Sequence, residues 1–234
     1  MSESSSSAHQ YSSAPRPAHH REEAPGRHRL SPGETFPAHT FADPEHSAAD
    51  LHDLCQMQAR LRLTLEGFPA DPAQLDRIYD AESLLTLTGL TVVGFRGLCR
   101  TDVSAALQEE VARVDMALGA HLERDQSRMI LGYSTRQLGP HEWLNLVVLR
   151  SEAGLQYWHR SPLHRYAAQE LSPQLYQGIR LHTASLPQGL SGALHLLATK
   201  YYAFGAAPWQ AQRSYGGGDL GAGERQRAVA TRAG

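Results

Sequence analysis

The chain has 234 residues, of which 41% are hydrophobic and 20% are charged, and its formal net charge is -2. A charge this close to zero argues against the strongly basic surface that binding to nucleic acid or to an anionic membrane requires. No apolar run approaches the ~20 residues of a membrane helix, and two cysteines are too few for a disulfide scaffold. We therefore expect a cytoplasmic protein whose partners include neither nucleic acid nor a membrane.

Both ends of the chain have the composition of disordered tails. Residues 1–47 are mostly Ser, Pro, Ala, His and Arg, and they hold six of the 13 histidines. Residues 214–234 are rich in glycine. Neither segment has enough large aliphatic side chains to offset the entropy lost on ordering. No spacing places the tail histidines on one element, so no metal site is expected there.

Residues 48–88 are expected to form a helical extension between the N-terminal tail and the first clear strand. Leucines recur at helical spacing up to Gly67, with Ser47 or Asp50 as the N-cap. A second short helix is expected after Asp71-Pro72, because this pair is typical of a helix start.

The segment 89–187 predicts an α+β domain with alternating strands and helices. The helix after residue 151 is expected to break at Ser161-Pro162, which is a good N-cap followed by a good first helical residue. The resulting order, β-α-β-β-α-β, is the ferredoxin-like arrangement with an antiparallel four-stranded sheet. Residues 188–213 are expected to add a C-terminal helical extension. The predicted strands are 90–98, 127–138, 141–151 and 178–186.

The predicted sheet has apolar residues on both faces, most clearly in "HEWLNLVVLRS" at 141–151. Helices of the β-α-β-β-α-β unit cover only one face of such a sheet. The other face must meet something apolar, and a second copy of the same sheet is the simplest partner. The pattern therefore predicts a homodimer with facing sheets.

The strand "WLNLVVLRS" followed by "SEAGLQYWHRSPLHRYA" resembles the dimeric α+β barrel superfamily. The match is to the antibiotic-biosynthesis-monooxygenase domain and its stress-responsive barrel relatives. In that family a hydrophobic third strand leads into a helix with an aromatic residue and an S-P-x-H step. Here the step runs from Ser161 to His164. The resemblance implies an oxygenase acting on an aromatic or polyketide-like small molecule without a metal.

In cofactor-independent members of the family, polar and aromatic side chains line a cleft between the sheet and the helices. The resemblance makes His164 the general base, with Asn145 and Trp143 as positioning residues. A histidine suits this role because its unperturbed pKa is about 6.5. The alternative is that His164 only orients the helix break. Asn145 lies either in the cleft or at the dimer interface, depending on which way its face points.

Four further residues are predicted to bind the substrate: Tyr157, Trp158, Arg180 and His182. Tyr157 and Trp158 are adjacent, so at most one of them faces the core. Arg180 and His182 share one face of the last strand, where they line either a polar pocket or a solvent-facing edge. His159 is expected to be exposed, because the proline break separates it from His164.

Three classes of function remain open from the sequence. The leading hypothesis is the metal-free oxygenase. The second is a non-catalytic barrel that binds a small molecule or only dimerises. The third is a haem-binding barrel in which His164 or His159 holds the iron, as one histidine does in related barrels. A Soret band would distinguish the third class, and oxygen uptake with dihydroquinones would distinguish the first.

Overall fold

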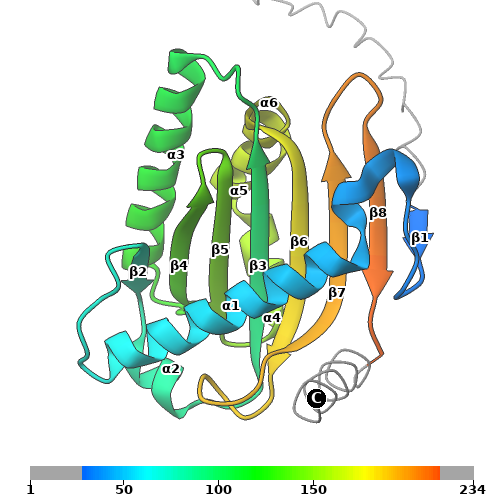
Figure 1. The fold of residues 1–234 in the computed structure, drawn as a ribbon. Helices are drawn as coiled ribbons and strands as arrows, with labels where there is room; N and C mark the ends of the chain where they lie inside the picture. Colours follow the sequence, from blue (N-terminus) through cyan, green and yellow to red (C-terminus); the bar gives the residue numbers. More distant parts are fainter. Residues whose placement is uncertain (1–27, 217–234) are drawn as a thin grey trace, which may run out of the picture.

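The computed structural model describes residues 28–216 and shows an α+β fold built on one open sheet. The strand order across the sheet is β1-β8-β7-β6-β3-β5-β4-β2 (Figure 1). Only the β1–β8 pair is parallel among the described strands, and the other neighbours are antiparallel. The strands are β1 His28–Leu30, β2 Gln74–Ile78, β3 Leu90–Cys99, β4 Ile130–Gly139, β5 Glu142–Leu149, β6 Tyr176–Leu186, β7 His195–Ala203 and β8 Trp209–Ser214.

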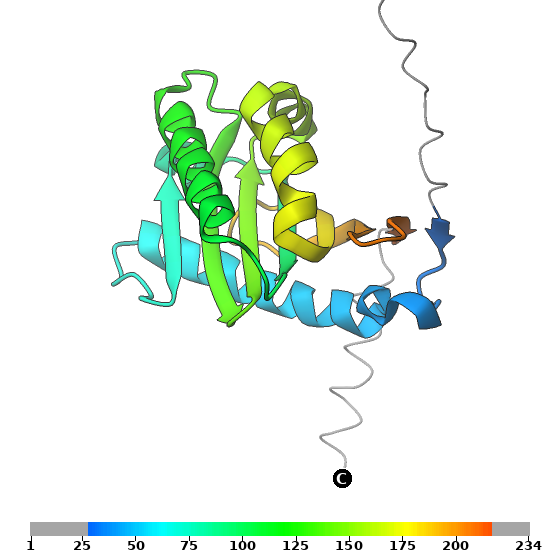
Figure 2. The same cartoon turned by 90° about the horizontal axis from the view of Figure 1, so that it is seen from above.

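Helices lie on both faces of the sheet. Helix α1 crosses one face, while α3 and the run from α4 to α6 lie on the opposite face (Figure 2). Within residues 28–216, no helix has the length and apolar character needed to cross a bilayer. The helices are η1 Pro37–Ala42, α1 Pro44–Leu65, α2 Ala81–Thr86, α3 Ala105–Arg124, α4 Glu152–Arg160, α5 Pro162–Tyr166, η2 Ala167–Leu171 and α6 Ser172–Leu175.

The antiparallel unit expected between residues 89 and 187 lies in the middle of this sheet. Strands β6, β3, β5 and β4 are neighbours, and β4 and β5 form the predicted hairpin. The predicted four-stranded ferredoxin-like sheet is, however, smaller than the observed sheet, which has eight strands within residues 28–216. β2 extends the sheet at one edge, and β7, β8 and β1 extend it at the other.

Helix α1 begins earlier than the sequence suggested. Pro44 occupies the first turn, where its fixed φ suits a helix, and Asp43 is the N-cap. Ser47 and Asp50 are therefore not caps but lie inside the helix, and both are buried. They share a buried helix face with Leu54, Met57 and Leu61, which follow at steps of three and four residues.

This buried face of α1 packs on the sheet face that was expected to meet a second copy. Leu54 lies directly over Gly94 of β3, where a Cβ atom would overlap the leucine side chain. Leu54, Met57 and Leu61 join one hydrophobic core with buried residues of β3, β5 and β6. The chain thus covers this apolar face itself, so the reason for predicting a homodimer no longer applies.

The two predicted helical extensions both contain strands. Residues 74–78 form β2, which pairs with β4, and only the following Ala81–Thr86 is helical. Residues 188–213 form β7 and β8 rather than a helix. Burial alternates along β7, with Thr199 and Tyr201 buried and Lys200 and Tyr202 only partly buried. This two-residue period is that of a strand in a sheet.

Part of the predicted N-terminal tail is ordered. Residues 28–47 contain β1, η1 and the start of α1, whereas 1–27 and 217–234 lie outside the described residues. Arg213 of β8 is fully buried and donates to backbone carbonyls of Ser31, Pro32, Glu34 and Ala42. A single side chain from the far end of the chain therefore satisfies the irregular backbone of this segment.

Candidate functional site

The two faces of the central strands differ in how completely they are covered. In β3, Val92 and Gly94 point toward α1 and are buried, whereas Val93 and Phe95 point toward α3–α6 and remain partly exposed. We call these the α1 face and the open face. The open face is the one that offers access to a ligand.

A cavity of about 120 Å³ lies on the open face between α3 and the η2–α6 segment. Most of its lining is aliphatic, and its polar groups are Asp115, Ser172 and the phenol of Tyr176. We call it the α3–η2 cavity. Its lining residues are Val111, Val114, Asp115, Leu118, Ala167, Leu171, Ser172, Leu175 and Tyr176.

The ring of Tyr176 lies against the backbone of β3. A Cβ atom at Gly97 would overlap this ring, so the glycine provides the space in which the ring lies. Phe95 packs its ring against Tyr176 in an edge-on arrangement at 5.4 Å. Burial raises the pKa of Tyr176, and the nearby Cys99, Tyr133 and Asp115 raise it further. The phenol therefore stays protonated at neutral pH and is able to donate a hydrogen bond.

Asp115 lies on α3 at the rim of the cavity and pairs with Arg77 of β2 at 3.1 Å. Arg77 lies across Gly119, where a Cβ atom would overlap its guanidinium group. The pair therefore ties α3 to the edge of the sheet. Burial first and the Asp115 charge second raise the pKa of the neighbouring Tyr133 to about 12.

Asn145 faces the helices, which answers the question that the sequence left open. Asn145 lies two residues before Val147 in β5, so both side chains point to the same face. Val147 and Trp158 of α4 pack against the same hydrophobic cluster on that face. Its Oδ1 accepts a hydrogen bond of 2.6 Å from Thr135 of β4. Trp143 lies two residues earlier on the same face and is 37% exposed. Neither residue belongs to the lining of the α3–η2 cavity.

His164 lies at the helix break, as expected. Ser161 accepts a hydrogen bond from the His164 backbone N–H, which caps α5. The ring packs against Trp158 at 4.6 Å, and its Nδ1 is buried without a hydrogen-bond partner among the described residues. Burial, and secondarily the charge of His159, lower the pKa of His164 to about 4. The imidazole is therefore neutral at pH 7.

The break does not separate the two histidines as predicted. The rings of His159 and His164 are 6.1 Å apart and nearly parallel, although His159 is exposed as expected. The chain therefore turns at Pro162 in a way that keeps both rings on one side. Within residues 28–216, no group of three or more His, Cys, Asp or Glu side chains is arranged to hold a metal ion.

Arg180 and His182 lie on the α1 face, opposite Asn145, and the prediction of a solvent-facing edge is wrong. His182 is fully buried, and Arg180 is 4% exposed. Both bind Asp50 of α1: Arg180 donates to its carboxylate at 2.5 and 2.9 Å, and His182 Nε2 lies 3.0 Å from it. Thr199 hydrogen-bonds to the other ring nitrogen of His182.

This Asp50 network holds α1 on the sheet. Burial alone would raise the pKa of Asp50, but hydrogen bonds and charge from His182 and Arg180 outweigh it and hold the pKa well below its usual range. Arg96 adds a further partner, with its guanidinium 3.6 Å from the Asp50 carboxylate. Asp50, Arg180 and His182 are enclosed and hydrogen-bonded to one another, so the network suits a structural role better than a substrate site.

The remaining predicted residue, Tyr157, contacts the loop after α3, where it interacts with Asp125 and Ser127. Trp158 faces the core, so only one of this adjacent pair is directed inward. The haem prediction fits the α3–η2 cavity poorly. The cavity is well below the ~300–1,000 Å³ of pockets for drug-sized ligands, and His159 and His164 do not line it.

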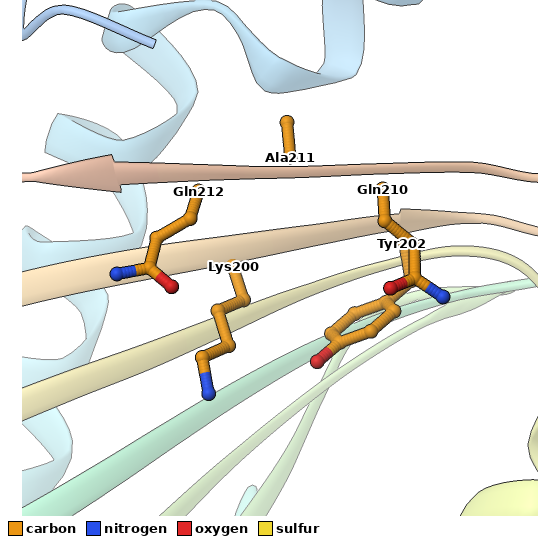
Figure 3. A pocket seen from close by; sticks show the side chains of 5 residues that line it. All are labelled: Lys200, Tyr202, Gln210, Ala211 and Gln212. Carbon is orange, nitrogen blue, oxygen red and sulfur yellow. The ribbon is translucent and has the colours of Figure 1, made fainter. Parts of the chain in front are cut away.

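A second hollow lies on the open face of β7 and β8 (Figure 3). Lys200, Tyr202, Gln210 and Gln212 point to one side of the sheet there, and Ala211 points to the other. Its volume of about 10 Å³ is close to the space that one water molecule occupies. The hollow is therefore too small for an organic ligand, and the α3–η2 cavity remains the better candidate.

Sequence reasoning missed every residue that lines the cavity. The signal was present in α3, where Val111, Val114 and Leu118 form an apolar face interrupted by Asp115. It was not recognised because an apolar helix face is far more often core than site. Comparison of the chain with family models, with curated proteins and with solved structures gives no match.

Proposed function

We propose that this protein binds a small, largely apolar molecule of about one aromatic ring in the α3–η2 cavity. The observation that carries the proposal is the cavity itself, at about 120 Å³ with a mainly aliphatic lining. An apolar cavity of ~150 Å³ stays dry and takes up benzene. The α3–η2 cavity has a similar size and a mainly aliphatic lining, and it is partly open to solvent, so an apolar ring can enter it.

The position of the cavity supports a binding role. It lies where two helical segments meet the open face of the sheet, and Asp115 at its rim is 51% exposed. α3 contacts the segment opposite it mainly through η2 and α5. The wide helical turn of η2, with its π-type backbone, lies on the cavity wall. Such turns occur frequently at functional sites.

Toluene is a suitable first probe for this proposal. Titration of the full-length chain with toluene is expected to shift the methyl NMR signals of Val111 and Leu118, which line the cavity. Leu118→Phe fills the cavity and should abolish the shifts. Leu197→Phe is the matched control, because Leu197 lies on β7 and is 40% exposed. Absence of saturable shifts in the unmodified chain would rule out the proposal.

A metal-free oxygenase is a second candidate, and the unpartnered Nδ1 of His164 is the observation that favours it. A buried ring nitrogen without a partner costs free energy unless a ligand completes it. As a base, however, His164 is weak. Moving a proton from a phenol of pKa about 10 to an imidazole of pKa about 4 costs roughly 8 kcal/mol.

Oxygen uptake with a panel of dihydroquinones tests the oxygenase. Uptake that requires the protein and disappears in His164→Gln would support it, provided that His159→Gln retains the activity. Uptake that is equal in both variants would remove His164 from the mechanism. Toluene binding without any oxygen uptake would leave the binding function alone.

A further inference from the structure

The polar groups of the α3–η2 cavity differ in whether they already have partners. Asp115 is paired with Arg77, and the Ser172 hydroxyl donates to the Ala167 carbonyl at 2.9 Å. Within residues 28–216, no hydrogen bond is among the causes that shift the pKa of the Tyr176 hydroxyl, which burial and the nearby Cys99, Tyr133 and Asp115 raise. It is thus the one polar lining group with an unused donor in that part of the chain.

The ring that carries this hydroxyl is held in place. It lies on Gly97, where a side chain would displace it, and Phe95 packs against its edge. A fixed donor on an apolar wall has few competing partners on the protein, so a ligand oxygen that accepts from it gains affinity. The donor also discriminates between ligands, because a bound ligand without an acceptor leaves it unpaired.

The charges around the hydroxyl are all negative when ionised. After burial, the groups that raise the pKa of Tyr176 are Cys99, Tyr133 and Asp115. Arg77 already pairs with Asp115, and Arg100 donates to the backbone carbonyls of Pro173 and Phe204. An anionic ligand would therefore meet repulsion from the Asp115 carboxylate, whereas a neutral ligand would not.

From this geometry we infer that the cavity selects neutral ring compounds with a carbonyl-type acceptor oxygen, which Tyr176 binds, and that Asp115 excludes anions. The inference rests on the proposed binding function and adds the chemical class of the ligand. It assigns specificity to two residues that contact the ligand space directly.

Three probes of similar size separate the parts of this inference in the full-length chain. Toluene has no acceptor, acetophenone has a neutral acceptor, and benzoate has an anionic one. Acetophenone is expected to bind three- to tenfold more tightly than toluene, because a typical net hydrogen bond is worth about that factor. Benzoate is expected to bind at least tenfold more weakly than acetophenone.

Single substitutions test which residue causes the preference for acetophenone and which causes the exclusion of benzoate. Tyr176→Phe should remove the preference for acetophenone and leave toluene binding unchanged, which also shows that the variant is folded. Tyr202→Phe, on β7 outside this cavity, should leave both affinities as they were. Asp115→Asn should reduce the difference in binding affinity between benzoate and acetophenone.

The outcomes separate this inference from the proposed function. If no probe binds, both are overturned. If toluene and acetophenone bind equally, or if Tyr176→Phe keeps the preference, the role of Tyr176 is overturned while the binding function stands. If benzoate binds as tightly as acetophenone, the exclusion of anions by Asp115 is overturned.

Discussion

Helices cover the two faces of the sheet in different ways. On the α1 face, one 22-residue helix packs on the strands and encloses a charged network centred on Asp50. On the open face, shorter helical segments from α3 to α6 leave the strand residues partly exposed and border a cavity of about 120 Å³ that is partly open to solvent.

Charged pairs show the difference most clearly. Asp50 is 1% exposed and binds side chains that are themselves buried, whereas Asp115 on the open face is 51% exposed in its pair with Arg77. Burial makes the first pair costly to break, and solvent screening makes the second weak. The α1 face is therefore suited to stability and the open face to binding.

The largest expected effect comes from removing the carboxylate at the centre of the Asp50 network. Asp50→Asn leaves Arg180 and His182 without their carboxylate and should lower the free energy of unfolding by about 3–5 kcal/mol. Asp115→Asn removes the exposed counterpart and should cost no more than about 1 kcal/mol. Urea denaturation at pH 7 measures both, and equal losses would contradict the division between the faces.

Local signals in the sequence predicted the central strands, the hairpin and the break at Ser161-Pro162. Strand alternation and helix caps involve residues close in the chain, so they can be recognised without the fold. The cover provided by α1 could not be recognised this way. Three of its buried positions, Ser47, Asp50 and Gln58, are polar and hide the helix face from a hydrophobic pattern.

The candidate site was harder to predict than the fold. Arg180 and His182 gain their role from Asp50, which is at least 130 residues away in sequence. The α3–η2 cavity likewise depends on how α3 meets η2 and on the glycine that makes room for Tyr176. Both features arise from long-range packing, which the sequence pattern does not encode locally.

Acid should weaken the open side of the molecule first. The pKa of His164 is about 4 in the folded chain and about 6.5 when unfolded, so below pH 6.5 the unfolded state binds a proton that the folded state rejects. The stability that the neutral ring contributes is complete above pH 6.5. It falls by up to roughly 3 kcal/mol as the pH drops to about 4.

Asp50 behaves differently on the α1 face. Its pKa is depressed in the folded state, so its contribution is lost only when the pH falls below the usual range of an aspartate. Urea denaturation between pH 7 and pH 4.5 should therefore give a flatter curve for His164→Gln than for the unmodified chain. His159→Gln should keep most of the slope, and an unchanged slope in His164→Gln would count against a buried neutral imidazole.

A smaller effect should follow from adding one methyl group under the cavity. Gly97→Ala places a Cβ atom against the Tyr176 ring and should cost about 1–3 kcal/mol through overpacking. Gly139→Ala is the control, because nothing lies within 4 Å of the added carbon there. Chemical denaturation gives the stabilities, and NMR signals of Tyr176 report the ring. An undisturbed Tyr176 ring in Gly97→Ala would show that the glycine does not set its place.

The smallest effect concerns the caps that hold the open-face helices. Ser161 caps α5 and Ser104 caps α3, each by accepting a hydrogen bond from a backbone N–H three residues on. Loss of such a cap typically costs about 1 kcal/mol. Ser104→Ala should show only that cost. Ser161→Ala should in addition raise the pKa of His164, because a frayed α5 would expose the ring and weaken the burial that lowers its pKa. An imidazole NMR titration measures this shift. An unchanged His164 pKa would mean that Trp158 packing, rather than the cap, keeps the ring buried.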